Sequence, residues 1–191
     1  MELYKVFVTK LLFFKKVFVI GFALNFIWVQ MVIAEPLNKQ DVSKLQRKST
    51  IEHLLYEVYL DTDKGVASVI GYHFDTFYHE NIYLSLAILG AVGGSRGGYG
   101  IAAFGLGYRQ ALAERFWFDS KILLGSGGGG GIPAGGGFAL EALAGISCEI
   151  MNTVYFDIKA GFLTFPSGEF STPVLQFGLS LQTFQVFLPW N

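Results

Sequence analysis

Nine charged or titratable side chains recur at alternate positions of short apolar runs, and these residues have the greatest capacity for chemistry. On an extended strand, alternate side chains project from one face. The charged side chains of the different strands would therefore lie together on one side of a sheet. Five are acids, three are bases and one is a histidine, so the acids cannot all find a basic partner. The nine residues are Glu57, His73, Asp75, Arg109, Asp119, Lys121, Glu141, Asp157 and Lys159.

Nucleophilic catalysis has little support in this set. A reactive serine needs a histidine beside it as a base. The histidines of the chain are His53, His73 and His79. None has a serine two residues away on the same strand face, and Ser68 or Ser85 would have to reach His73 through the fold. The sequence therefore predicts no catalytic residue.

Metal and phosphate chemistry are also poorly supported. The three histidines are widely spaced and Cys148 is the only cysteine, so no metal-site spacing is present. The glycine-rich stretch 125–137 lacks the Lys-Ser/Thr pair of a phosphate-binding loop. We interpret it as a flexible surface loop, and Arg96 in another loop as a solvated charge. No cofactor is predicted.

The elements that must position these residues are eight runs with a period of two, which predicts strands and not helices. In the clearest run, Val154, Phe156 and Ile158 alternate with Tyr155 and Asp157. The expected strands are 54–61, 66–78, 82–91, 99–112, 116–124, 138–150, 153–165 and 175–181. The phase of the alternation slips near residue 183, which predicts either a bulge or the end of the last strand there.

The connections alternate between short and long. Short ones cover 79–81, 113–114 and 151–152, and longer ones cover 61–65, 93–98, 125–137 and 166–173. With eight strands, every short turn falls on the same side as both chain ends, as in an outer-membrane barrel. The fold class predicted is therefore all-β, an eight-stranded antiparallel up-and-down barrel.

The scarcity of charge decides which face of the barrel is outside. From residue 66 onward only 13 of 126 positions carry Asp, Glu, Lys or Arg, whereas a solvated surface carries roughly a quarter to a third. The apolar face must therefore contact lipid, and the barrel is transmembrane. Aromatic residues beside the short turns predict an interfacial belt. They are Tyr78, Tyr108, Phe116, Trp117 and Phe156.

The N-terminal third has the layout of a secretory signal. Basic residues precede an apolar stretch, and Val32-Ile33-Ala34 fits a small-residue cleavage site. An uncleaved membrane anchor is the alternative, since the stretch 17–34 is near the minimum length for a span. We expect a signal helix over 1–34, a polar tail over 35–50 and the barrel over 51–191.

The signal, the eight alternating runs and the turn pattern resemble small outer-membrane barrels, typified by the transmembrane domain of outer membrane protein A and by outer membrane protein X. The resemblance covers the chain from about residue 54 onward. It implies insertion by the barrel-insertion machinery, which reads a terminal aromatic residue. Here Trp190 is preceded by Pro189 and followed by Asn191, which departs from that pattern.

An eight-stranded lumen is about wide enough for side chains alone. We therefore interpret the nine residues as a structural polar network, with water or a protonated carboxyl accommodating the excess acid, in preference to a proton or ion pathway.

The predicted function is a non-catalytic structural or interaction protein of the cell outer membrane. Its partners would be membrane lipid and, through the loops, lipopolysaccharide or an extracellular ligand. The net charge of −1 gives no reason to expect nucleic acid. The alternatives are an outer-membrane lipid-modifying enzyme and a soluble periplasmic barrel that binds a small ligand.

Overall fold

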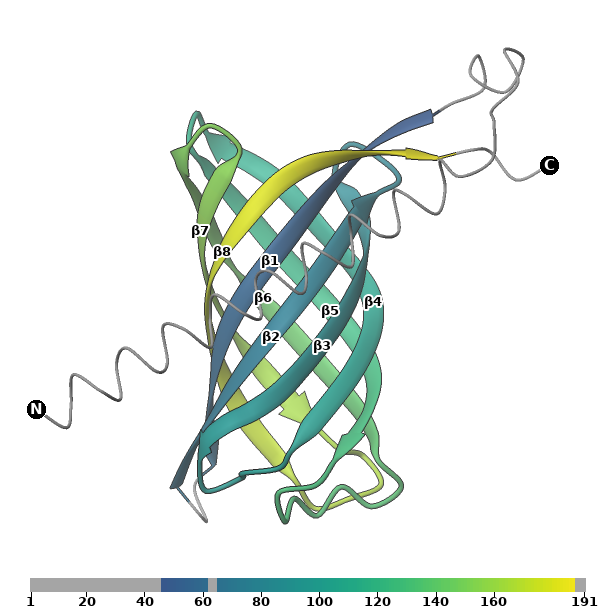
Figure 1. The fold of residues 1–191 in the computed structure, drawn as a ribbon, viewed down its shortest axis with the longest axis vertical. Helices are drawn as coiled ribbons and strands as arrows, with labels where there is room; N and C mark the ends of the chain where they lie inside the picture. Colours follow the sequence, from purple (N-terminus) through teal and green to yellow (C-terminus); the bar gives the residue numbers. More distant parts are fainter. Residues whose placement is uncertain (1–45, 62–64, 188–191) are drawn as a thin grey trace, which may run out of the picture. The chain divides into compact units, whose positions relative to one another are not determined.

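The chain forms a closed antiparallel barrel in which each strand pairs with its neighbours in sequence (Figure 1). The computed structural model describes residues 46–61 and 65–187. The strands are β1 (Gln46–Asp61), β2 (Gly65–Phe77), β3 (Ile82–Gly94), β4 (Gly100–Ala113), β5 (Phe116–Gly128), β6 (Phe138–Met151), β7 (Val154–Thr164) and β8 (Ser171–Phe187). The predicted eight-stranded up-and-down barrel is confirmed.

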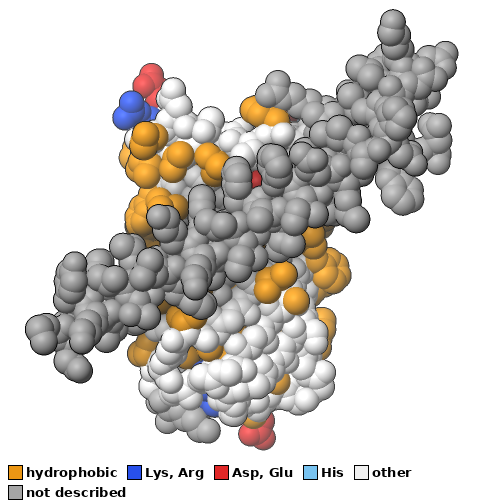
Figure 2. Space-filling model, in the orientation of Figure 1, with side chains coloured by type: hydrophobic (Ala, Val, Ile, Leu, Met, Phe, Trp, Pro, Cys, Tyr) orange, Lys and Arg blue, Asp and Glu red, His pale blue; other side chains and the backbone are white. Residues whose placement is uncertain are grey.

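Because the sequence alternates with a period of two, successive side chains of each strand face the lumen and the outer surface of the barrel in turn. Large apolar side chains face outward, and Leu86, Ile88 and Phe104 are 59%, 70% and 60% exposed. Figure 2 shows hydrophobic side chains on the visible parts of the outer wall, with charged side chains mainly near its ends. Charged and small residues face inward. A wall of this polarity suits contact with acyl chains.

Short turns and long loops lie at opposite ends of the barrel, as predicted. Residues 78–81, 114–115 and 152–153 connect strands at the end where β1 begins and β8 finishes (Figure 1). The loops 95–99, 129–137 and 165–170 connect strands at the other end. No helix capable of crossing a bilayer occurs among the described residues.

Two strand boundaries differ most from the prediction, the start of β1 and the end of β8. β1 begins at Gln46, although we expected a strand from residue 54 and a polar tail up to residue 50. Polar contacts with β8 extend it, since Thr50 and Thr183 hydroxyls lie 2.7 Å apart and Gln182 Nε2 donates to Ser49 Oγ at 3.1 Å. β8 runs on to Phe187, so the strand does not end near Thr183. The predicted signal and residues 35–45 lie outside the described residues.

Thr153 is the one described non-glycine residue with a positive φ, +69°, in the two-residue turn between β6 and β7. A β-branched residue is strained there. Thr153→Gly should therefore stabilise the barrel by about 1 kcal/mol, measured by urea unfolding in lipid vesicles. Thr153→Ala keeps the strained φ and should give little gain. Equal effects of the two substitutions would contradict this explanation.

Candidate functional site: the polar network of the lumen

All nine residues singled out in the sequence are buried inside the barrel, at most 5% exposed. Six strands contribute them, because each strand places alternate side chains in the lumen. Together with His53 they form three groups: His53 between two aspartates, a lysine–aspartate pair near the turn end, and two glutamates toward the loops.

His53 is the centre of the network, and sequence reasoning missed it. Its Nε2 lies 2.9 Å from Asp75 Oδ2 and its Nδ1 lies 3.1 Å from Asp157 Oδ2. Each ring nitrogen of His53 therefore lies within hydrogen-bond distance of an aspartate oxygen. Ser85 Oγ donates to Asp75 at 2.5 Å, and Ser147 donates to Asp157. His53 thus joins β1 to both β2 and β7.

Two lysines place buried cations in the network. Lys121 Nζ lies 3.0 Å from Asp75 Oδ2 and 3.3 Å from His73 Nδ1. His73 therefore accepts from the ammonium group through Nδ1. Lys159 Nζ donates to Asp119 Oδ1 at 2.5 Å, and Tyr83 donates to the same oxygen at 2.8 Å.

Arg109 closes the network toward the turn end of the barrel. Its Nη1 lies 3.8 Å from Asp119 Oδ2. The guanidinium lies 4.6 Å from the centre of the Tyr155 ring and 5.4 Å from that of Trp117. Trp117 consequently faces inward, so it does not belong to the predicted interfacial belt. The other members, Tyr78, Tyr108, Phe116 and Phe156, are 38–61% exposed.

Glu57 and Glu141 stand apart from these ion pairs. Glu57 Oε1 accepts from Gln176 Nε2 at 2.6 Å. Its Oε2 and both carboxyl oxygens of Glu141 have no hydrogen-bond partner in the described part of the chain. The excess of acid expected from the sequence is therefore concentrated in these two residues.

The loop end of the lumen is closed by packed side chains. Tyr99 stacks edge-on against Tyr59 and Phe165, with ring centres 5.7 and 6.4 Å away. Loop residues Ile132, Ala134 and Phe170 are buried in the same cluster. The glycine-rich loop therefore packs against this cluster through Ile132 and Ala134, and its flexibility stays a prediction.

Arg96 also corrects a prediction. It is 3% exposed, donates from Nη1 to the Gly131 carbonyl at 2.6 Å and lies over the Phe170 ring. The solvated loop charge expected from the sequence is instead a buried link between two loops. Burying a guanidinium is favourable only with such partners. Arg96 therefore helps hold the loops together.

Comparison with known proteins identifies solved structures that share this fold. No family model and no curated protein matches the sequence. The N-terminal β-barrel domain of Pseudomonas aeruginosa OprF has a TM-score of 0.52 and 10% identity, covering 72% of this chain and 100% of that chain. The fold and the apolar wall are those of an outer-membrane barrel.

Two further structures share this barrel. The Yersinia pestis outer membrane protein Ail, solved in a phospholipid bilayer nanodisc, has a TM-score of 0.51 and 9% identity, covering 72% of this chain and 100% of that chain. A de novo designed transmembrane β-barrel has a TM-score of 0.52 and 8% identity, covering 70% of this chain and 95% of that chain. At these identities the likeness concerns the fold.

The geometry of the lumen does not form a hydrolytic triad. Ser85 and His53 both bind the carboxylate of Asp75, whereas nucleophilic catalysis requires the serine to donate to the histidine. Ser147 has the same relation to His53 through Asp157. All of these side chains are buried, so no described serine is activated by a histidine at an accessible surface.

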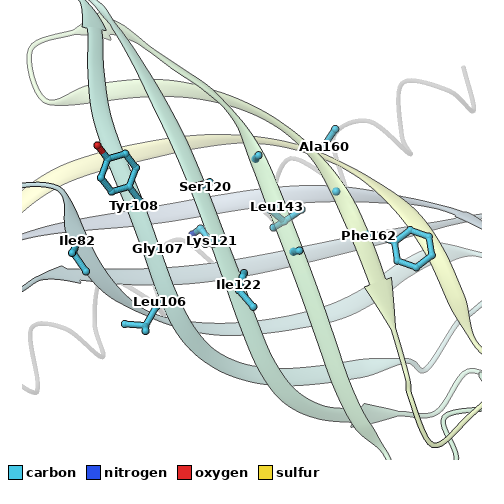
Figure 3. Close-up of a pocket in the computed structure, with 13 residues that line it drawn as sticks. Ile82, Leu106, Gly107, Tyr108, Ser120, Lys121, Ile122, Leu143, Ala160 and Phe162 are labelled. Carbon is cyan, nitrogen blue, oxygen red and sulfur yellow. The ribbon is translucent and has the colours of Figure 1, made fainter.

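A depression lies on the outer wall over β4 to β7 (Figure 3). The strand register aligns three small residues there, Ser120, Ala144 and Ala160. Larger side chains, including Tyr108 and Phe162, surround them. Because these residues face outward in the apolar wall, acyl chains would cover the depression in a bilayer. It is a feature of the lipid contact and not an aqueous cleft.

Proposed function

We propose that this chain is a non-catalytic outer-membrane barrel with a structural or interaction role. The observation that carries the proposal is the lumen, which is filled by charged and polar side chains and covered by packed loops. Buried ion pairs at 2.5–3.0 Å cross it from several strands. A barrel filled in this way anchors the protein in the membrane and displays its loops, because side chains occupy the lumen.

The proposed topology follows from the connections. The short turns face the periplasm and the loops face outward, as in barrels of this fold. Residues 1–34 act as the signal and residues 35–50 include the periplasmic tail. Membrane lipid contacts the wall, and the barrel-insertion machinery recognises the last strand.

The loop surface is the proposed interaction surface, and its chemistry is unusual. Within the described loops 95–99, 129–137 and 165–170, Glu169 is the only exposed charged residue. Small residues supply the rest, including Ser95, Pro133 and Ser167. At these three loops a lipopolysaccharide or extracellular partner would therefore meet mainly backbone and small polar groups. Loops that are held by packing lose less entropy on binding.

The lumen proposal is tested by reconstitution in planar bilayers. The wild-type barrel should give no steady conductance, and Asp157→Ala should not reduce the background, because packed side chains already fill the lumen. Steady conductance that disappears in Asp157→Ala would identify an ion pathway and overturn the proposal.

The catalytic alternative has a separate test. Lipid A from cells with and without the gene should have identical mass spectra, while the protein fractionates with outer membranes and shifts its gel mobility on boiling. Loss of an acyl modification when the gene is deleted would favour a lipid-modifying enzyme.

A further inference from the structure

Glu57, Glu141, Tyr59, Tyr99 and Gln176 form a buried group of oxygen-bearing side chains beneath the loops. We refer to them as the glutamate cluster. All five are at most 3% exposed. Gln176 Nε2 donates to Glu57 Oε1 at 2.6 Å, and the ring centres of Tyr59 and Tyr99 lie 5.7 Å apart. Glu141 is close enough to Glu57 and to both tyrosines to interact with them electrostatically, so the five side chains share one region of the lumen.

The cluster has more acceptors than it can satisfy. Four acceptor oxygens have no hydrogen-bond partner among the described residues: Glu57 Oε2, Glu141 Oε1, Glu141 Oε2 and Gln176 Oε1. Tyr59 interacts with Glu57 and Tyr99, but neither tyrosine hydroxyl makes a well-formed hydrogen bond, and each can donate one hydrogen. Two donors cannot satisfy four acceptors, and buried polar atoms are costly when unpaired.

The nearby cations are already engaged elsewhere. Lys121 Nζ contacts Asp75 and His73, and Lys159 Nζ contacts Asp119. No ion pair with either glutamate occurs within the described ranges. Neither glutamate carboxyl group is therefore in contact with a positive group in the described part of the chain.

We propose that the glutamate cluster binds one hard cation of the calcium class, coordinated by its oxygens. Ca²⁺ prefers carboxylate and carbonyl oxygens and tolerates irregular geometry, whereas Mg²⁺ requires a near-ideal octahedron. Two carboxylates match its charge, and the Gln176 carbonyl and the tyrosine oxygens are neutral ligands. No group of three or more His, Cys, Asp or Glu side chains forms a metal site in the part of the chain described, so this site depends on those neutral oxygens.

The test uses the full barrel refolded in detergent micelles and freed of metal with a chelator. At constant ionic strength, wild-type protein should bind one Ca²⁺ per barrel by equilibrium dialysis. Saturation at ~100 times Kd should raise its melting temperature by roughly 5–10 °C. Mg²⁺ and Na⁺ at the same ionic strength should have smaller effects.

Glu57→Gln combined with Glu141→Gln preserves the shape of both side chains and should abolish Ca²⁺ binding and the thermal shift. The matched control is Glu80→Gln with Glu114→Gln, which removes two exposed carboxylates from the turns. This control should leave Ca²⁺ binding and the thermal shift unchanged. If the first variant does not refold, Glu141→Gln alone should weaken Ca²⁺ binding at least tenfold.

Terbium provides a second measurement, because tyrosines next to a bound Tb³⁺ sensitise its luminescence. Excitation of wild-type tyrosines should give emission that Ca²⁺ displaces, and Tyr59→Phe should reduce it. Absence of a Ca²⁺ effect in the wild type, or Ca²⁺ binding that survives loss of the glutamates, would overturn the proposal. The first outcome would indicate that protons alone neutralise the cluster.

Discussion

Lys159→Met should destabilise the barrel by about 3–5 kcal/mol, the typical cost of leaving a buried charge without its partner. Lys159 and Asp119 are each 1% exposed, and Lys159 Nζ donates to Asp119 Oδ1 at 2.5 Å. Methionine fills a similar volume but offers no donor. Asp119 would retain the hydrogen bond from the Tyr83 hydroxyl at 2.8 Å and the more distant Arg109 guanidinium at 3.8 Å. Urea unfolding in lipid vesicles measures the loss.

A double-mutant cycle separates the ion pair from simple repacking. Asp119→Asn alone should also be destabilising, because it leaves the Lys159 ammonium group buried without its carboxylate. Combining Lys159→Met with Asp119→Asn removes both charges, so the double variant should recover most of the stability lost in Lys159→Met. Additive losses would show that the two side chains do not depend on each other.

The alternation of the sequence was enough to place the charged residues of the lumen. A strand has a fixed period of two, so a shift of its pairing register by one residue would make Asp157 and Lys159 face the lipid. The scarcity of charge elsewhere then identified the inside. Both arguments are local, which explains why they worked without knowledge of the barrel.

His53 was missed because its role depends on closure. It contacts Asp157, which is 104 residues away in sequence, across the junction where the barrel closes. Its strand was also predicted to begin at residue 54, since the apolar alternation is weak before that point. The phase shared by His53, Leu55 and Glu57 was the available signal. The pairing of Glu57 with Gln176 depends on the same closure.

The packing of the loops could not be predicted for a different reason. Glycine is common both in flexible segments and where backbones pack closely. Gly135 has a φ of +57°, and a Cβ there would lie 2.0 Å from the Ser167 carbonyl oxygen. Glycine at this position therefore allows two loop backbones to pack closely. Composition cannot distinguish these uses, and the burial of Arg96 depends on the same loop packing.

Gly161→Ala should prevent normal assembly of the wall or cost more than about 3 kcal/mol, at the upper end of what overpacking costs. Gly161 pairs with Leu143 on β6. A Cβ at Gly161 would lie 1.9 Å from the Ala142 carbonyl oxygen and 2.9 Å from Leu143 Cα. These are backbone atoms of the neighbouring strand, and they can move only by disturbing the β6–β7 ladder.

Gly93→Ala is the matched control, because Gly93 also lies in a strand and a Cβ there would meet no atom within 4 Å. It should be neutral or stabilise by a few tenths to about 1 kcal/mol, since alanine restricts the unfolded chain. The fraction refolded is measured by the heat-dependent gel shift, and stability by the urea midpoint. The close approach of β6 and β7 explains why glycine stands at an inward position of a membrane strand. If Gly161→Ala refolded and unfolded like Gly93→Ala, the two strands would have room for a side chain and that explanation would fail.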